Sequence, residues 1–343
     1  MKIFPIHNYI YSKISRFYLA EWIKPLFPKH RHSLFGLDPS DLEISQNESD
    51  SDAFILPLTW NYYFDELRIN KAIDSIDKYL HWDKPIFSWA GGDYTLKIPN
   101  QNAFLFRQNG YQSLRRENEH AYPVIIKDPL NYLNWKEIKI VKKEKTPKIG
   151  FCGLASNNWI DTNLRAIKDY IFRSKIEVKK PYLDLSVPIS GTNLRRKTLK
   201  ILSNSKLVDT NFLVRSFSGG QKINSREQKL EFWENIISCP YILCIRGAGN
   251  YSARFYETLA MGRIPIFVNT DCILPLDNQI NWKNHCVWVE DYELDNILKI
   301  INNFHAKLSD DEFAQIQIDN RELWIKKLTF HGFYNSFKSK YEN

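Results

Sequence analysis

Short runs of apolar residues alternate along the chain with longer segments whose apolar residues recur every three or four positions. Fully apolar runs are typical of parallel strands covered on both faces, and the longer spacing is typical of helices that bury one face. The predicted strands are residues 3–6, 53–58, 86–89, 124–126, 149–152, 241–245 and 264–268. The predicted helices are residues 67–80, 230–237, 294–304 and 313–328. Alternation in both halves favours an α/β fold over an all-β fold or a helical bundle.

The length of the chain and one polar segment indicate two domains. The chain has 343 residues, whereas single hydrophobic cores rarely grow beyond ~250–300 residues. Residues 136–148 are rich in lysine, carry few large apolar side chains and contain Pro147 just before a predicted strand. We therefore place a hinge at 142–147, an N-terminal domain at 1–145 and a C-terminal domain at 146–343. The last helix is able to pack back on the first domain.

Residues 240–282 form the most informative part of the chain. The predicted strand 241–245 breaks at three residues typical of a tight turn, Arg246, Gly247 and Gly249. Asn250 or Ser252 then has the residue type that caps a helix, and Gly262 has the type that ends one in the left-handed conformation. The apolar strand 264–268 follows at once, so this segment is predicted to form a βαβ unit.

A βαβ unit of this kind places the amides of a helix N-terminus at the carboxyl end of the sheet, where open α/β folds bind ligands. Gly247 and Gly249 allow the backbone to approach an anion, and Arg246 and Arg254 can donate charge-assisted hydrogen bonds to phosphate oxygens. Glu257 lies three residues after Arg254 and can accept from two ribose hydroxyls. The pattern predicts a nucleoside diphosphate site. The alternative is an ordinary surface ion pair between Arg254 and Glu257.

The same turn argues against a dinucleotide-dependent dehydrogenase. The fingerprint G-x-G-x-x-G is absent, because Ser252 stands where the third glycine belongs. No acidic residue closes the following strand in the usual place, so the ribose contact of such enzymes is missing as well.

At these residues the chain resembles the exostosin-like glycosyltransferases, glycosyltransferase family 47. The positions that match the family pattern are Leu243, Cys244, Arg246, Gly247, Ser252, Arg254, Glu257, Gly262, Ile264, Pro265, Leu274, Pro275, Ile280 and Trp282. The chain departs from it at Ile245, where the family usually has proline, and at Arg263, where it often has cysteine. The resemblance implies a GT-B fold of two Rossmann-like domains with a donor cleft between them. It also implies an inverting transfer from a nucleotide sugar, usually UDP-linked, bound by the C-terminal domain.

The resemblance and the local pattern together assign roles to individual residues. The expected donor-binding residues are Gly247, Gly249, Asn250, Ser252, Arg254 and Glu257. Arg246 is expected to stabilise the leaving diphosphate, and Asp93, after a predicted strand of the N-terminal domain, to act as the general base. Asp93 could instead be a turn residue that stabilises its own backbone. His7 and Asp65 are weaker candidates for the base.

Aromatic residues make up 14% of the chain, and several lie together in the first domain. Trp60, Tyr62 and Trp89 are expected on the acceptor side, where their faces could pack on sugar rings. Core packing is the alternative for all three.

The net charge of +8 does not indicate nucleic-acid binding, because no basic helix with interleaved aromatic residues occurs. The expected partners are a nucleotide-sugar donor and a glycan or lipid-linked glycan acceptor, with loose attachment to an anionic membrane surface as an option. There is no run of ~18 apolar residues and no signal-peptide core. We expect a cytoplasmic protein, with peripheral attachment at the inner face of a membrane as an option.

No metal and no further cofactor are expected. Asp50 and Asp52 match the D-x-D pattern of metal-dependent glycosyltransferases, but they precede a strand, whereas the metal-binding motif follows one. A helix dipole and arginines can take the place of the metal. Two other classes fit the same donor residues: an epimerase or hydrolase that acts on the nucleotide sugar, and a binding protein without catalytic activity.

Overall fold

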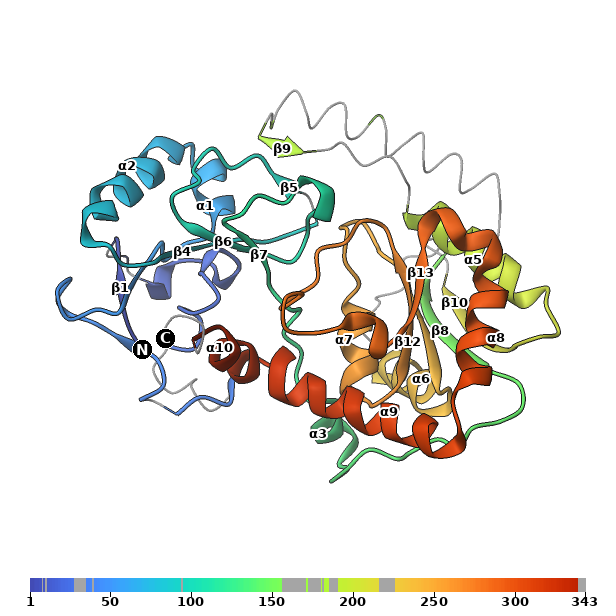
Figure 1. Ribbon diagram of the computed structural model, residues 1–343. Helices are drawn as coiled ribbons and strands as arrows, with labels where there is room; N and C mark the ends of the chain where they lie inside the picture. The colour runs from blue at the N-terminus through green and yellow to red at the C-terminus, as the bar shows by residue number, and fades with distance from the viewer. Residues whose placement is uncertain are drawn as a thin grey trace.

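The computed structural model contains two α/β domains side by side, each built on a parallel sheet (Figure 1). It describes residues 1–7, 9, 11–27, 35–38, 40–93, 95–155, 171, 180, 182–184, 191–215 and 226–338. The predicted α/β class is therefore confirmed, with a sheet in each half of the chain.

The N-terminal sheet has six parallel strands in the order β2-β1-β3-β4-β6-β7. They are β1 (Lys2–Pro5), β2 (Glu43–Ile44), β3 (Ala53–Ile55), β4 (Ile86–Ala90), β6 (Phe104–Arg107) and β7 (Glu119–Ala121). Phe87 and Phe106 face α10 (Phe330–Lys338), where both rings contact Phe337. Phe54 points to the other face and contacts Tyr79 of α2 (Ile69–Tyr79), so helices cover the sheet on both sides. The short helix α1 (Trp60–Asp65) precedes α2.

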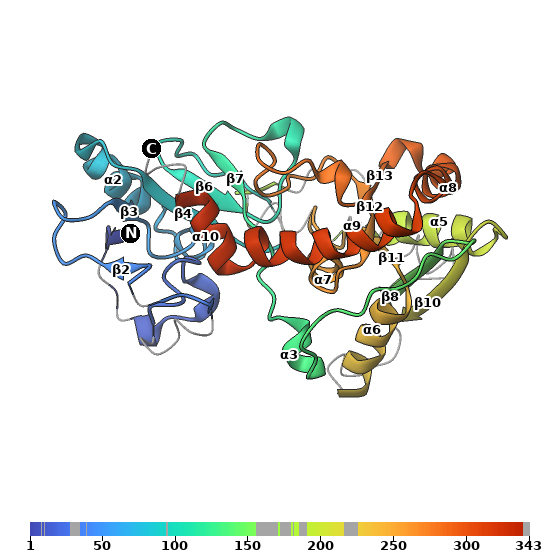
Figure 2. The ribbon, with the colours of Figure 1, turned by 60° about the horizontal axis from the view of Figure 1, so that its bottom comes forward.

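The C-terminal sheet has five parallel strands in the order β10-β8-β11-β12-β13. They are β8 (Lys148–Leu154), β10 (Asp209–Arg215), β11 (Tyr241–Cys244), β12 (Ile264–Asn269) and β13 (Val287–Glu290). One core cluster joins the sheet to α5 (Gly191–Ser203), α8 (Ile297–Lys307) and α9 (Asp310–Leu323), and another joins it to α6 (Arg226–Ser238) and α7 (Ala253–Ala260). After β8 the chain adds β10 on one side of β8, and then adds β11 on the other side of β8. The strand order therefore reverses between β8 and β11 (Figure 2).

Two short segments outside the two sheets add further connections between the domains. The strand β9 (Leu183–Asp184), which follows β8 in the chain, pairs with β5 (Thr95–Leu96) of the first domain. After α9 a π-helical turn (Trp324–Leu328) leads into α10, which lies against the N-terminal domain (Figures 1 and 2).

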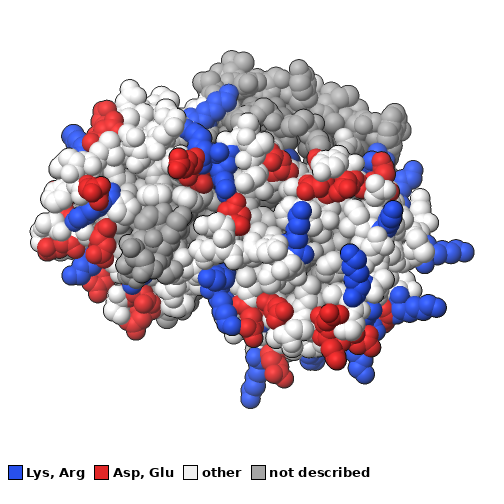
Figure 3. Space-filling view, viewed as in Figure 1, with Lys and Arg blue, Asp and Glu red and all other residues white. Residues whose placement is uncertain are grey.

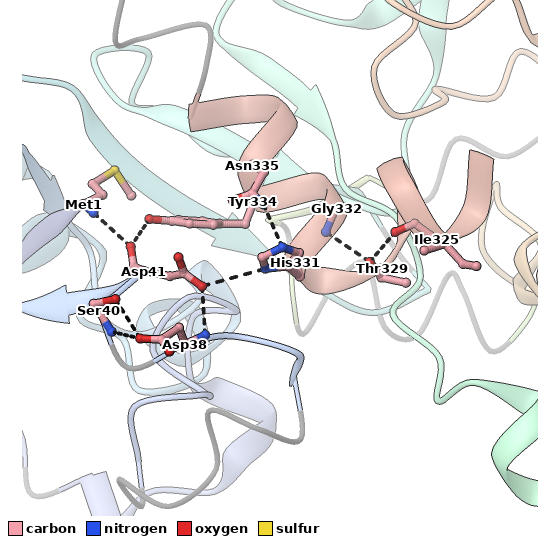
Figure 4. A network of polar contacts seen from close by, with 10 residues as sticks. All are labelled: Met1, Asp38, Ser40, Asp41, Ile325, Thr329, His331, Gly332, Tyr334 and Asn335. Carbon is pink, nitrogen blue, oxygen red and sulfur yellow. Dashed lines mark hydrogen bonds and ion pairs between the residues drawn. The ribbon is translucent and has the colours of Figure 1, made fainter. Parts of the chain in front are cut away.

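Polar contacts attach α10 to the start of the chain (Figure 4). The Tyr334 hydroxyl and the amino group of Met1 both donate to the backbone carbonyl of Asp41. The His331 ring lies 3.8 Å from the Asp41 carboxylate. Together with the buried rings Phe330, Phe333 and Phe337, these contacts make α10 part of the N-terminal core.

The face of the molecule in Figure 3 carries lysines and arginines interspersed with acidic residues. The five cysteines are all buried and form no disulfide. Within the described part of the chain, no helix has both the length and the apolar character needed to cross a membrane.

Most predicted strands and helices are present, and one predicted strand is wrong. Residues 124–126 have no strand partner; Val124 and Ile126 instead pack against the core that contains α7, on the C-terminal domain. The sequence pattern also missed β6, β7, β10, β13, α5 and α10. Before the crossing, Tyr122 is buried in the N-terminal cluster and Ile125 packs against it. The intervening α3 (Pro129–Leu133) packs with the C-terminal domain.

Arg263, a departure from the family pattern, is fully buried behind α7. Its guanidinium donates to the carbonyls of Ile236 (3.1 Å), Ile237 (3.0 Å) and Lys139 (3.0 Å). Burial lowers the pKa of Arg263 to about 10. A single side chain thus ties the end of α6 and the crossing segment to the start of β12.

Arg263→Met should lower the free energy of unfolding of the C-terminal domain by about 3 kcal/mol or more, because each buried carbonyl left without a donor costs ~1–3 kcal/mol. Urea denaturation followed by tryptophan fluorescence measures this. Lys326→Met is the control, since it removes only a surface ion pair with Glu322, worth ~0–1 kcal/mol. Similar unfolding midpoints for the two variants would show that the Arg263 contacts contribute little.

Candidate functional site

The predicted βαβ unit is present, with β11, α7 and β12 in the expected order. Ser252 is the N-cap residue of α7, although its side chain makes no capping hydrogen bond. Gly262, just after the helix, adopts a φ of +63°, which favours glycine. The turn between β11 and α7 therefore opens at the carboxyl end of the sheet, next to the place where the strand order reverses.

Three arginine side chains converge on this turn from two helices and the end of β11. Arg254, in the first turn of α7, donates to the Cys152 carbonyl of β8. Arg195 of α5 donates to the carbonyls of Leu154 (3.0 Å) and Ile245 (3.1 Å). It thereby bridges the ends of β8 and β11.

Arg246, the third of these arginines, is only 3% exposed. It makes long hydrogen bonds to the Asn250 side chain (3.3 Å) and the Ala248 carbonyl (3.4 Å). The Nε atoms of Arg246, Arg254 and Arg195 are buried and have no partner in the described part of the chain. These guanidinium groups are oriented by the protein and still have donor capacity to spare.

No described carboxylate forms a close ion pair with this arginine cluster, although Glu257 lies near enough to affect the pKa of Arg254. None of the three arginines forms an ion pair with a described acidic residue. Burial, and secondarily the nearby Arg254 and Arg246, lowers the pKa of Arg195 to about 10. Burial also lowers the pKa of Arg254. The site therefore favours a bound anion that would compensate the positive charge.

Close backbone approach explains two glycines of the site. A Cβ atom on Gly191, the first residue of α5, would lie 2.4 Å from the Gly247 carbonyl oxygen, and one on Gly153 would lie 2.6 Å from Arg254 Nη2. Larger residues at either position would displace the arginines or the turn. Gly191 also brings the N-terminus of α5 against the turn, so that α5 and α7 both begin at the arginine cluster.

Glu257 lies one turn into α7 and is half-buried. Burial raises the pKa of its carboxyl group, although the nearby Arg254 opposes that shift. No described residue forms an ion pair with it. The alternative of a surface ion pair with Arg254 is therefore not supported, and the carboxylate remains an available acceptor near the arginine cluster.

Asn250, expected to bind the donor, connects the two domains instead. Its side-chain amide donates to the carbonyls of Gly110 (2.9 Å) and Thr270 (2.9 Å), while its backbone N–H donates to Asn109 Oδ1 (2.8 Å). Its own Oδ1 accepts from the Thr270 hydroxyl (2.6 Å). Because these polar groups are satisfied within the protein, Asn250 positions the turn rather than offering a free contact.

Asp93 of the N-terminal domain is brought against the same turn. Its carboxylate accepts from the Tyr251 hydroxyl (3.1 Å), and its backbone carbonyl accepts from Asn109 (2.6 Å). The preceding loop is fixed by two hydrogen bonds between Asn61 and Gly91. Burial, with a further contribution from Asp93, raises the pKa of Tyr251 to about 12. The expected base is therefore in contact with the turn that carries the expected diphosphate site.

Two of the expected acceptor-side residues are core residues. Trp60 is 1% exposed and donates to the Ser88 hydroxyl, and Trp89 is 2% exposed and stacks on Phe106. Neither can contact an acceptor in this structure, so that expectation is corrected in favour of core packing. Tyr62 is half-buried and packs edge-on against Tyr9.

The lesser candidates have structural partners. His7 contacts the Ser75 hydroxyl at 2.9 Å, and burial lowers its pKa. Burial alone would raise the pKa of Asp65, but hydrogen bonds from Lys180, Tyr18 and Tyr182 hold it below its ordinary value.

The D-x-D match lies away from the turn between β11 and α7. Asp52 accepts from the Lys2 backbone before β3, and Asp50 lies on the same exposed loop. No three histidine, cysteine or acidic side chains gather as a metal site among the described residues.

Sequence reasoning missed Arg195 and Asn109. Both follow segments without a distinctive motif, and only the spatial arrangement of the chain brings them to the turn. A pocket of about 510 Å³ opens beside Arg246 toward the ends of β12 and β13. It is bordered on the other side by residues 111–114 of the N-terminal domain.

No model of a protein family matches the chain, and no curated protein sequence matches it. Comparison with solved structures finds distant similarity to glycosyltransferases. A variant of TarM from S. aureus, solved with fondaparinux, α-GlcNAc-glycerol and UDP, is 10% identical with a TM-score of 0.38. The match covers 75% of this chain and 51% of TarM, so the chain spans about half the length of that protein. A glycosyltransferase from Rickettsia africae ESF-5 is 11% identical with a TM-score of 0.37, over 99% of this chain and 97% of that one. At this distance, the function has to be inferred from the site itself.

Proposed function

We propose that this protein is a glycosyltransferase of the GT-B type. In this proposal it transfers a sugar from a nucleoside diphosphate sugar, UDP-linked as the family resemblance implies, to a hydroxyl of a glycan or lipid-linked glycan. One observation carries the proposal: three arginines meet where the strand order of the C-terminal sheet reverses, oriented by backbone carbonyls and not neutralised by described carboxylates. A diphosphate has the charge and the acceptor oxygens that such a cluster binds.

The two parts of a nucleotide fit neighbouring groups of the site. The diphosphate would lie against Arg246 and Arg195 at the N-termini of α5 and α7, where the helix dipoles add to the attraction. The half-buried carboxylate of Glu257 would then accept from the ribose hydroxyls. Binding would give Glu257 the hydrogen-bond donors that it lacks among the described residues.

The transfer step divides between the domains. Asp93 takes the proton of the acceptor hydroxyl while that oxygen forms a bond to the anomeric carbon of the donor sugar. The bond from the same carbon to the diphosphate oxygen breaks, and the electron pair leaves with the diphosphate. Arg246 and Arg195 stabilise that charge, a task for which no metal is required in this scheme. Attack opposite the leaving group inverts the anomeric configuration.

A thermal-shift screen against UDP, GDP, CDP and ADP, with and without magnesium, tests the donor site. We expect one nucleotide to raise the melting temperature without magnesium, because a ligand that binds only the folded state stabilises it. No shift with any of the four would overturn the proposal. Binding of a nucleotide sugar without acceptor-dependent turnover would instead indicate a binding protein.

Glu257→Gln should separate stability from binding. Burial raises the pKa of Glu257, so its ionised form opposes folding at neutral pH, and glutamine should raise the melting temperature of the free protein by about 1–2 °C. This gain should vanish below the ordinary pKa of a carboxyl group, where the folded and unfolded states are both protonated. The stabilisation by nucleotide should fall at the same time. A free protein that is less stable at neutral pH would contradict the assignment.

Arg246→Ala and Glu257→Ala should differ in kinetics. We expect Glu257→Ala mainly to weaken nucleotide binding, and Arg246→Ala mainly to lower kcat, by about 10²–10³-fold, because charge on the leaving group would be less stabilised. Binding of the free nucleotide and release of UDP from the donor measure the two effects. Equal losses in both variants, with circular dichroism unchanged, would contradict this division.

Asp93→Asn should abolish acceptor-dependent release of UDP while leaving nucleotide binding within about twofold, because the amide cannot take the proton. Tyr251→Phe is the matched control, since it removes the hydrogen bond to Asp93 and leaves the carboxylate in place. A panel of glycan and lipid-linked glycan acceptors supplies the hydroxyl. Full activity of Asp93→Asn would exclude Asp93 as the base, and UDP release without any acceptor would favour a hydrolase.

A further inference from the structure

The pocket beside Arg246 extends away from the arginine cluster and has a different character. Its volume is about 510 Å³, and it lies between the carboxyl ends of β12 and β13 and residues 111–114. Arg246 is the one basic residue among those that line it, whereas three of the others are carboxylates, Asp271, Glu290 and Asp291. If a phosphate of the ligand binds Arg246, the group attached to that phosphate would lie among these acceptors.

Two of the carboxylates are held in fixed positions. One Glu290 oxygen accepts from the Asn269 amide (2.7 Å) and the other from the Trp288 indole (2.7 Å). Asp271 accepts from the hydroxyl and the backbone N–H of Ser113. Both Glu290 oxygens and Asp271 Oδ1 keep a further lone pair, so these groups are oriented acceptors for hydroxyl or ammonium donors. They are half-buried, which strengthens their effect on a neighbouring charge.

Arg246, at one end of the pocket, gives a second and independent indication that a ligand binds there. Arg246 lines the pocket and is only 3% exposed. Its Nε has no hydrogen-bond partner in the described part of the chain. An anionic group bound there would neutralise the one positive charge among the described lining residues. The other charged residues of the described lining would then all be carboxylates.

We infer that this pocket holds the sugar of the donor and selects neutral or amino sugars against uronic sugars. The inference rests on the proposed function and adds the charge class of the transferred sugar. Hydroxyl and ammonium groups can donate to Glu290 and Asp291, whereas the carboxylate of a uronic sugar can only accept and would be repelled. The exposed ring of Tyr292, 81% accessible at the rim, offers an apolar face to a sugar ring.

Matched donors test the charge class. Isothermal titration compares UDP-glucose with UDP-glucuronate, which differ only at C6, and UDP-glucosamine adds a cationic member. If the screen selects guanine, GDP-mannose and GDP-mannuronate form the equivalent pair. We expect the uronate to bind at least tenfold more weakly than its neutral partner, and the amino sugar at least as tightly as the neutral one.

Charge variants test whether the pocket is responsible. Glu290→Gln and Asp291→Asn should each reduce, at least threefold, the ratio between the Kd of the uronate donor and the Kd of the neutral donor. Asp295→Asn is the control and should leave it unchanged, because Asp295 is an exposed partner of Lys197 outside the pocket. A uronate that binds as tightly as the neutral sugar, or a ratio that neither pocket variant reduces, overturns this inference and leaves the donor site intact. Failure of the free nucleotide to bind removes the donor site and this inference together.

Discussion

The proposed site depends on three arginines, of which Arg246 is buried and Arg195 and Arg254 are half-buried, and none of them forms an ion pair with a described carboxylate. Backbone carbonyls at the ends of β8 and β11 hold Arg254 and Arg195, and these carbonyls orient the guanidinium groups without neutralising them. Desolvation of a cation is unfavourable, so the protein must compensate for it. The ends of two strands, two helix N-termini and a close glycine contact together build the cluster. Arg263 shows the contrasting use of the same chemistry, because its donors are engaged by carbonyls deep in the core.

The second constraint is the direct connection between the domains. Asn250 and Asn109 hydrogen-bond across the boundary, and Ser113 binds Asp271 beside them. These contacts place a carboxylate of one domain next to the cationic turn of the other. Neither domain contains the complete cleft by itself, so the proposed chemistry depends on how closely the two sheets are held.

The sequence predicted the part of the site that is contiguous in the chain. A strand, turn and helix within residues 240–282 placed Arg246, Arg254 and Glu257 correctly relative to the sheet. Arg195 could not be found in this way, because it reaches the turn from α5 in a separate part of the chain. Asn250 was assigned to the ligand because its partners in the other domain leave no trace in the local pattern. Trp60 and Trp89 show that an aromatic cluster in sequence does not reveal exposure. The strands β6 and β7 have short apolar runs next to a charged residue, since Arg107 ends β6 and Glu119, its ion-pair partner, begins β7.

The position of α10 has a consequence for biosynthesis. The rings of Phe333 and Phe337 fill one face of the N-terminal sheet, yet the ribosome makes them after the entire C-terminal sheet. During translation, the first sheet must therefore wait with an uncovered apolar face while the second domain emerges and folds. The N-terminal domain, although synthesised first, would be the last to reach its final packing, and its exposed aromatic residues would be the natural target of a chaperone in that interval.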